Sequence, residues 1–219
     1  MLKLHGFAVS NYYNMVHLAL LEKGLAFETV SVYASQDEAF LAISPRGKVP
    51  VLQTEQGFIN ETSVILDYLE ELGEGRPLLP ADAYERARVR SLAREIELYI
   101  ELPARSCYAE AFFRTPVADA IKDKARAELQ AGIATLKRHG RFAPYVAGEQ
   151  FSVADLYFLY SIDLAEAVAQ RVLGFELLAD FPAARTLLEQ LQRNPHVQAI
   201  AAEKDAGMGA FMAYLSQKK

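Results

Sequence analysis

The pattern of apolar and polar residues in the first third of the chain predicts alternating strands and helices. Val16, Ala19 and Leu20 follow the spacing of one helical face, and Gly24 just after them is typical of a helix end. The expected order is strand, helix, strand, short helix or turn, strand, strand and helix, over residues 1–7, 12–23, 27–32, 36–43, 48–53, 58–59 and 62–72.

Beyond residue 84 the strand pattern disappears and helical spacing dominates. Leu92, Ile96 and Ile100 lie on one face of a long helix, which Pro103 is expected to bend or break because proline has no amide hydrogen. Thr115-Pro116 is typical of the cap and first turn of a following helix. Later helices are expected around 129–136, 156–169, 183–191 and 197–202.

A linker separates these two parts of the chain. Segment 73–82 holds two Gly and two Pro in ten residues, which is the strongest linker signal present. A chain of 219 residues is long enough for two small domains, each with a core. We therefore predict an α/β domain over 1–76 and an all-helical domain over 84–219.

Composition and charge narrow the class of protein. With 52% hydrophobic and 23% charged residues, the chain is typical of a folded globular protein. Its 23 Lys and Arg against 28 Asp and Glu give a net charge of −5, so no nucleic-acid partner is expected from the charge. Neither a membrane span nor a secretory signal is recognisable, so a cytoplasmic protein without membrane contact is expected.

The sequence offers little for metal or redox chemistry. Cys107, the only cysteine, cannot form an internal disulfide or a Cys-x-x-Cys pair, and we expect it to be a buried small hydrophobe. The four histidines lie far apart, without the spacing of a metal-binding motif. No metal is therefore expected.

Pro50, in K-V-P-V-L, interrupts a predicted strand. Proline lacks a ladder donor and usually lies at strand edges or starts, and a plain edge-strand proline is one interpretation. The other is a cis Val49-Pro50 bond, which would turn the main-chain groups of Val49 outward to pair with an extended, peptide-like ligand. The local sequence leaves both open.

Two further positions lie where helices begin. Thr62 could give its N–H and hydroxyl to a ligand carboxylate, with Glu61 facing an ammonium group, or Thr62 could simply cap the helix. Ser10 could likewise be an N-cap, or could donate to a ligand thiol and favour its thiolate. No histidine is placed to make Ser10 a nucleophile, so a hydrolase triad is the weaker idea.

Taken together, these motifs resemble the cytosolic glutathione transferase superfamily over the whole chain. The V-P-V-L strand, E-T-S at the next helix, the Pro-rich linker and the helical remainder occur in the order typical of that family. S-N-Y-Y-N-M-V-H-L-A-L-L-E-K-G resembles its serine-type classes, and F-S-V-A-D at 151–155 is similar to its helix-capping motif. The resemblance implies a thioredoxin-like N-terminal domain and a helical C-terminal domain.

The resemblance also assigns roles to individual residues. It implies that Ser10 activates the glutathione thiol, that Val49 beside cis-Pro50 pairs with the cysteinyl backbone, and that Glu61 and Thr62 hold the γ-glutamyl end. Lys48, and less strongly Gln36, are candidates for the glycine carboxylate. Tyr12 or Tyr13 could replace Ser10 at the thiol. No cysteine lies near Ser10, and the S-S-C-x-W-R pattern of maleylacetoacetate isomerases is absent.

The second substrate is expected between the domains, against the first long helix of the second part. Candidates for lining this pocket are Tyr12, Tyr99, Arg105, Tyr108 and Phe112. Ser152 and Asp155 are excluded from the active site, because their S-x-x-D spacing predicts a capping box worth about 1 kcal/mol or more to folding.

The expected function is that of a glutathione S-transferase, an enzyme that adds the glutathione thiolate to a small apolar electrophile or uses it for reduction. This implies a cytoplasmic detoxification enzyme that uses glutathione as co-substrate, and by resemblance a homodimer. Two alternatives stay open: a non-enzymatic binding or regulatory protein of the same fold, and a glutathione-dependent isomerase or dehalogenase.

Overall fold

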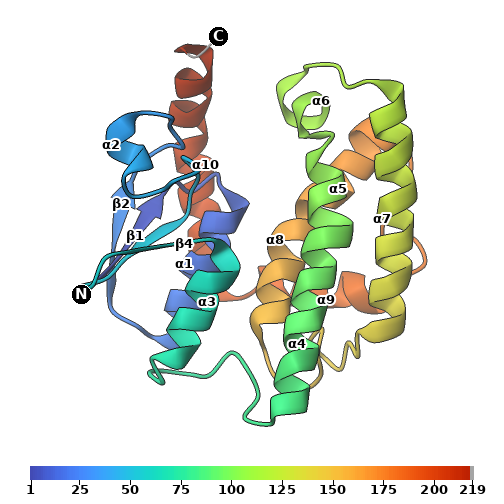
Figure 1. Ribbon diagram of the computed structural model, residues 1–219. Coiled ribbons are helices and arrows are strands. Elements are labelled where there is room, and N and C mark those ends of the chain that lie inside the picture. Colours follow the sequence, from blue (N-terminus) through green and yellow to red (C-terminus); the bar gives the residue numbers. More distant parts are fainter. Residues whose placement is uncertain (218–219) are drawn as a thin grey trace. The chain divides into compact units, whose positions relative to one another are not determined.

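The computed structural model describes residues 1–217, which form two compact units, each with its own core (Figure 1). One unit comprises residues 1–78 together with the segment from Gln192 onward, and the other comprises residues 79–191. The predicted division placed the whole segment 84–219 in the second domain. The final helix instead packs on the first helix of the N-terminal unit, and its Phe211 ring stacks on Phe7, just before that first helix, with centroids 5.1 Å apart.

The N-terminal unit is built on a four-stranded sheet with strand order β2-β1-β3-β4. Strand β1 pairs in parallel with β2, and antiparallel pairing joins β1 to β3 and β3 to β4. The strands are β1 (Leu2–Gly6), β2 (Phe27–Ser31), β3 (Val51–Gln53) and β4 (Phe58–Asn60). Strand β3 is shorter than the predicted 48–53, because Pro50 cannot donate to a ladder and lies just before the strand.

Helices cover this sheet. Helix α1 packs against both α3 and α10, and almost all of its residues are buried. The helices of the unit are α1 (Asn11–Lys23), α2 (Glu38–Leu41), α3 (Thr62–Glu71) and α10 (Pro195–Gln217). The sheet and helices confirm the predicted thioredoxin-like domain. Helix α10 is far longer than the predicted 197–202: it continues through Met208, Phe211, Met212 and Leu215, which keep helical spacing beyond the predicted end.

The second unit consists of helices, as predicted, with α4 packed against α7 and α8. Its core centres on α8, in which Tyr157 and Phe158 are among the largest fully buried side chains. The elements are α4 (Ala83–Ile96), the π-helical turn η1 (Glu97–Glu101), α5 (Leu102–Arg105), α6 (Tyr108–Phe113), α7 (Asp119–His139), α8 (Val153–Val168), the π-helical turn η2 (Ala169–Leu173) and α9 (Pro182–Gln192).

Pro103 neither bends the first long helix sharply nor breaks it. The path continues from α4 through η1 into α5, and the winding widens to a π-helical turn just before the proline. In an α-helix the Tyr99 carbonyl would accept from residue 103, whose nitrogen has no hydrogen, so the wider turn relieves this mismatch. Gly132 on α7 leaves room for the Tyr99 carbonyl, because a Cβ added at residue 132 would lie 2.3 Å from the Tyr99 oxygen.

The predicted helix start at Thr115-Pro116 is wrong. Helix α7 begins at Asp119, and Ala118 precedes it in extended conformation. The loop before it is fixed from α6 instead, because the Val117 N–H donates to the Glu110 carboxylate at 2.8 Å. The loop before α7 is therefore held by the Glu110 side chain, seven residues before Val117, and Thr115 does not cap the helix.

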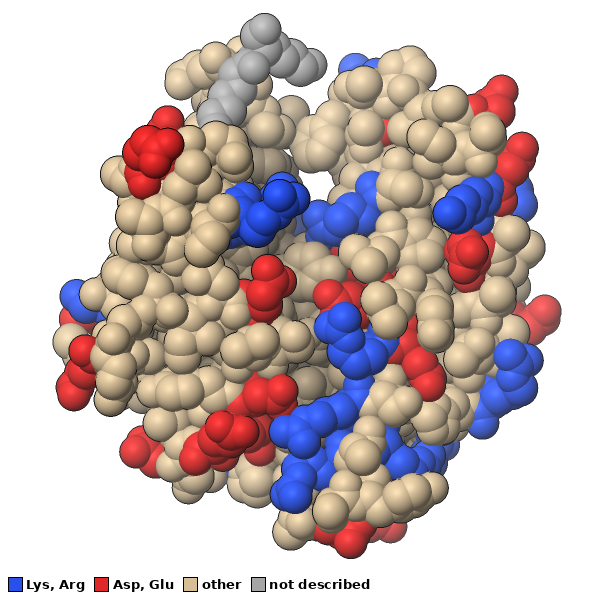
Figure 2. Space-filling view, viewed as in Figure 1, with Lys and Arg blue, Asp and Glu red and all other residues tan. Residues whose placement is uncertain are grey.

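Basic side chains gather over α4 in the space-filling view (Figure 2). Arg86 donates to the backbone oxygen of Pro80, Arg88 donates to that of His139, and Arg94 pairs with Glu97. Most of this charge therefore serves contacts within the unit.

Among residues 1–217, no helix combines the length and apolarity needed to span a bilayer.

Candidate functional site

The sheet brings three loops to one edge of the N-terminal unit. His5 on β1 pairs with Val51, and Val51 also pairs with Asn60 on β4. The residues just beyond these pairs are therefore neighbours at the same edge: the turn that follows β1, Pro50 before β3, and Glu61 after β4. Helices α1 and α3 both begin there, so two positive helix ends face this edge.

Ser10 caps α1, as one interpretation of the sequence predicted. Its side-chain oxygen accepts from the Tyr13 N–H at 3.3 Å, and its own N–H donates to the Phe7 oxygen at 3.0 Å. A hydroxyl that accepts still has a hydrogen to donate, so capping and donation to a ligand are compatible. Asn14 supports the turn, because its side-chain amide donates to the Ala8 oxygen at 2.9 Å.

The two tyrosines beside Ser10 differ in burial. Tyr13 is 4% exposed and packs with its ring against Gly6, where an added Cβ would lie 2.3 Å from the tyrosine ring. Burial, with a smaller contribution from Glu203, raises the pKa of Tyr13 to about 12. This phenol belongs to the core and does not ionise at neutral pH, whereas Tyr12 is half-buried at the start of α1.

The Val49-Pro50 bond is cis, one of the two alternatives that the sequence left open. Pro50 is buried and Val49 is half-buried. The loop before them is held by Ser44, whose hydroxyl donates to the Lys48 oxygen at 2.7 Å and accepts from the Lys48 N–H at 3.0 Å. Lys48 itself is exposed, so its ammonium group can reach a ligand from solvent.

A second contact links this loop to the segment after β2. Gly47 has φ +62, and a Cβ added there would lie 2.0 Å from the Ser35 oxygen. The Gln36 side-chain amide spans the same gap and donates to the Ser35 and Arg46 oxygens, both at 3.4 Å. In this structure the Gln36 side chain therefore links the two segments by hydrogen bonds to their backbone.

Glu61 and Thr62 begin α3 in an unusual way. Glu61 occupies the N-cap position with φ 67, and its side chain makes no capping hydrogen bond. Such a conformation is uncommon for a residue with a side chain and is often kept at functional sites. Thr62 is the first helical residue and is 6% exposed. The interpretation of Thr62 as an N-cap is therefore wrong, because the cap position falls one residue earlier.

The remaining predicted pocket residues lie in the second unit, apart from Tyr12. Tyr99 is 43% exposed on η1. Arg105 and Tyr108 meet at the buried carboxylate of Glu101, which accepts from Arg105 Nη2 at 2.6 Å and from the Tyr108 hydroxyl at 3.0 Å. Phe112 contacts the Tyr108 ring edge-on, with centroids 5.1 Å apart. Three of the predicted residues thus form one cluster.

Cys107 and the capping motif behave as predicted from the sequence. Cys107 is fully buried. A capping box starts α8, in which the Ser152 N–H donates to the Asp155 carboxylate at 2.8 Å. Asp155 also accepts from the Val146 N–H at 2.9 Å, which ties the preceding loop to the helix. Both residues therefore serve folding.

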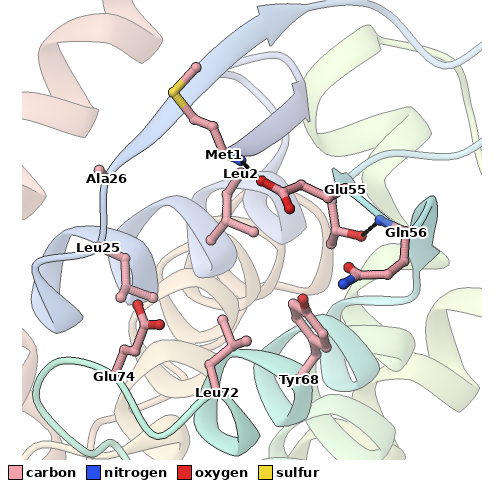
Figure 3. A pocket seen from close by; sticks show the side chains of 10 residues that line it. Met1, Leu2, Leu25, Ala26, Glu55, Gln56, Tyr68, Leu72 and Glu74 are labelled. Carbon is pink, nitrogen blue, oxygen red and sulfur yellow. Dashed lines mark hydrogen bonds and ion pairs between the residues drawn. The ribbon is translucent and has the colours of Figure 1, made fainter.

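A cavity of about 340 Å³ lies at the other end of β3 from Pro50 (Figure 3). It is lined by Glu55 and Gln56 from the turn after β3 and by Tyr68 from α3. The Met1 ammonium group pairs with Glu55 at 3.1 Å. None of the predicted site residues lines this cavity, so it is separate from the edge with two helix ends. Within residues 1–217, no three potential metal ligands lie together.

Sequence reasoning missed the residues that support the site. Ser44 and Asn14 hold the two loops, and Glu101 anchors Arg105 and Tyr108, but each is a single polar residue without a motif. A polar residue inside an apolar helical stretch was the available signal for Asn14, which is 2% exposed. Glu101 offered the same signal at a fully buried position beside Ile100.

Comparisons with known proteins agree with this architecture. Residues 4–77 match the family model for the glutathione S-transferase N-terminal domain. A glutathione S-transferase from Pseudomonas putida is 63% identical over 219 residues, which cover 100% of both chains. A maleylpyruvate isomerase from Ralstonia sp is 28% identical over 218 residues, covering 94% of this chain and 100% of that protein.

Solved structures give the same result. A maleylacetoacetate isomerase from Methylobacterium extorquens AM1, with bound malonate and GSH, has a TM-score of 0.71 and 28% identity and covers 90% of this chain and 95% of its own. Glutathione transferase F2 from Populus trichocarpa has a TM-score of 0.80 at 18% identity and covers 94% of this chain and 100% of its own. At that identity the similarity supports the fold alone. The chain is therefore a member of the glutathione S-transferase family, the family that its motifs predicted.

Proposed function

We propose that this glutathione S-transferase binds glutathione along the sheet edge at Ser10, Pro50 and Thr62 and joins its thiol to a small electrophile. The observation that carries the proposal is the arrival of two helix N-termini at one edge, each with a polar residue in its first turn or cap. At neutral pH, with its thiol protonated, glutathione carries two carboxylates and one ammonium group, and such helix ends favour the carboxylates.

Each residue at the edge has a distinct role in this proposal. Thr62 gives its N–H and hydroxyl to the γ-glutamyl carboxylate, while Glu61 faces the ammonium group. The backbone of Val49 pairs with the cysteinyl residue. The exposed Lys48 binds the glycine carboxylate. Two features of Glu61 support this assignment: its backbone has the uncommon φ of 67, and its side chain makes no capping hydrogen bond.

Ser10 activates the thiol by donating a hydrogen bond to sulfur at the N-terminus of α1. An ordinary thiol has a pKa near 8.5, and both the donor and the helix dipole favour its thiolate. The thiol proton leaves to solvent, the thiolate attacks the electrophilic carbon, a carbon–sulfur bond forms, and the leaving group departs with its electron pair. Positioning and a lowered thiol pKa supply the catalysis.

Calorimetric titration with glutathione tests the binding site. Wild type is expected to bind with a Kd between about 1 μM and a few mM, and Thr62→Ala should weaken this binding roughly tenfold, as loss of a hydrogen bond to a charged group predicts. Thr29→Ala on β2 is the matched control, because Thr29 is exposed in the same unit and lies away from that edge of the sheet. Equal affinities in the two variants would contradict the assignment of Thr62.

A second candidate function is glutathione-dependent isomerisation. It is favoured by the similarity to a maleylpyruvate isomerase and to a maleylacetoacetate isomerase, each 28% identical to this chain. The thiolate would add to a double bond and leave again, so that glutathione is not consumed. Measuring glutathione consumption with chlorodinitrobenzene and with a maleyl substrate separates the two reactions, and binding without either reaction would favour a non-enzymatic binding protein.

We further propose that the protein acts in the cytoplasm as a homodimer and takes part in detoxification. The similarity over the full length to a glutathione S-transferase supports this proposal. Light scattering coupled to size-exclusion chromatography tests the dimer, since one chain has a mass of 24.3 kDa. A mass near 24 kDa across the micromolar range would contradict it.

A further inference from the structure

The cavity at the other end of β3 from Pro50 is built from a single compact unit. Its walls come from the start of β1, the connection from α1 to β2, the turn after β3, and the C-terminal half of α3 with the loop that follows it (Figure 3). All of these segments lie within residues 1–78. A volume of about 340 Å³ is at the lower end of the range for small-molecule pockets, so the cavity can hold one small ligand.

Much of the cavity lining is apolar, with an aromatic ring at one side. Leu2, Leu25 and Leu72 supply the apolar part, and the half-buried Tyr68 supplies the ring. Figure 3 shows the Leu2 and Leu72 side chains pointing toward each other, with Tyr68 beside Leu72. Such a lining suits an apolar ligand body, and a flat ring packs on a tyrosine in offset or edge-on geometry.

Two carboxylates border this apolar lining, and the chain neutralises only one of them. Glu55 pairs with the Met1 ammonium group at 3.1 Å, so this wall already holds a primary ammonium. The Glu74 carboxylate enters the cavity from the side opposite Glu55 (Figure 3). Glu74 is exposed, and within residues 1–217 it has no ion-pair partner. One ammonium group against two carboxylates leaves the lining with one net negative charge, which favours a ligand with a single positive charge.

Two helices end beside the cavity, and their negative ends also favour a cation. Helix α1 ends at Lys23 and α3 ends at Glu71, and cavity-lining residues follow shortly after each end. The carbonyl groups at a helix C-terminus favour positive charge nearby. Lys23 does not supply this charge to the cavity, because its buried ammonium group donates to the Glu70 carboxylate at 2.6 Å and to the Arg76 backbone oxygen at 3.2 Å.

We propose that this cavity binds an arylalkylamine, a small molecule with one ammonium group and an aromatic ring. The ammonium group pairs with Glu74, and the ring packs on Tyr68 and Leu72. A divalent metal ion does not suit the cavity, since no three potential metal ligands lie together within residues 1–217. The inference goes beyond the proposed transferase function and does not depend on it, because the cavity and the proposed glutathione site lie at opposite ends of β3.

A matched pair of ligands tests the class of molecule. 2-Phenylethylamine carries the ammonium group, and 2-phenylethanol has the same ring and chain length with a neutral hydroxyl. Both are titrated by NMR into the full isotope-labelled chain without glutathione. The amine should bind roughly fivefold more tightly, the upper end for an exposed ion pair, and should shift the backbone amides of Ala26, Gln56 and Glu74. Equal affinities, or shifts centred on Ser10 and Thr62, would overturn the inference.

Glu74→Gln tests the charge. The amide has nearly the same shape as the carboxylate without its charge, so the variant should bind the amine and the alcohol equally. Glu71→Gln is the matched control: it removes one negative charge at the end of α3, but Glu71 is exposed and does not line the cavity. A preference for the amine that persists in Glu74→Gln, or that is lost equally in Glu71→Gln, would overturn the inference.

Tyr68→Leu tests the ring separately from the charge. It keeps an apolar side chain but removes the aromatic contact, so both ligands should bind roughly threefold more weakly. The preference for the amine should remain, because Glu74 is unchanged. Unchanged affinities of both ligands in Tyr68→Leu would overturn the placement of the ligand ring on Tyr68.

Discussion

The hydroxyl of Tyr214 donates to the backbone oxygen of Ala34 at 2.8 Å and so ties α10 to the segment that follows β2. The Tyr214 ring also stacks on Tyr33, with centroids 4.2 Å apart. Ala34 is followed by Ser35, whose backbone oxygen lies close to Gly47. The last helix of the chain therefore braces the loop that carries Lys48 and leads to Pro50.

Replacing Tyr214 should loosen this brace. Tyr214→Phe removes one hydrogen bond and is expected to lower the free energy of unfolding by about 1 kcal/mol, whereas Tyr214→Ala also removes the stacked ring and should lower it by about 2 to 4 kcal/mol. Urea denaturation measures both values. Tyr84→Phe, at a side chain that is 72% exposed, should change little.

The close approach at Gly47 gives a second prediction. Gly47→Ala should weaken glutathione binding severalfold, because the new Cβ would lie 2.0 Å from the Ser35 oxygen and push the Lys48 loop away. Gly73→Ala is the matched control, since Gly73 has φ +67 but has nothing within 4 Å of its added Cβ. Both variants carry the same backbone strain, of about 1 kcal/mol. Calorimetric titration should find weakened binding in Gly47→Ala alone.

Ser10→Ala should affect both stability and chemistry. The Tyr13 N–H loses its acceptor, so unfolding is expected to become easier by about 1 kcal/mol. The pKa of the bound glutathione thiol should rise, because its donor is gone, while glutathione binding changes little. Thiolate absorbance during a pH titration measures this pKa, and Tyr13 does not interfere because burial raises its own pKa to about 12.

Ser10→Thr separates these two effects. It keeps a hydroxyl, so both the cap and the lowered thiol pKa should be largely retained. An unchanged thiol pKa in Ser10→Ala would instead assign the activating contact to another residue at the start of α1.

The predictable features of this protein are those that local sequence determines. Gly24 marks the end of α1 and adopts φ 69, and the alternation of strand and helix patterns was sufficient to place Ser10, Pro50 and Thr62 after or before strands that pair. Strands β1 and β4 run in the same direction on either side of β3, so the helices that follow them begin at one edge, and the candidate site could be assembled from topology.

What could not be predicted depends on contacts between distant residues. The return of α10 to the N-terminal unit rests on Tyr214 and Ala34, which are 180 residues apart, and neither has a motif. The π-helical turn before Pro103 requires a glycine on another helix, Gly132. Glu101 is acidic in an otherwise apolar stretch, and only the fold brings Tyr108 to it. The sequence around each of these residues gives no sign of its distant partner.

Asp155 combines complete burial with three donors. The carboxylate is 0% exposed and accepts from Val146 N–H, Ser152 N–H and the Ser152 hydroxyl, at 2.9, 2.8 and 2.9 Å. Burial raises the pKa of Asp155 from 3.8 to about 6, and the hydrogen bonds oppose this rise without cancelling it. The native state therefore holds the proton more tightly than the unfolded chain.

This pKa gives a pH-dependent stability with a definite sign. Between the unfolded pKa of 3.8 and the folded pKa of about 6, the native state binds more protons, so this group makes the free energy of unfolding fall as pH rises, by up to about 3 kcal/mol in total. Asp155→Asn removes the titration, although it also weakens the capping box. Urea unfolding of both proteins from pH 4 to 7 measures the difference in slope. Parallel curves would show that Asp155 titrates with the same pKa in both states, and that its three hydrogen bonds offset burial completely.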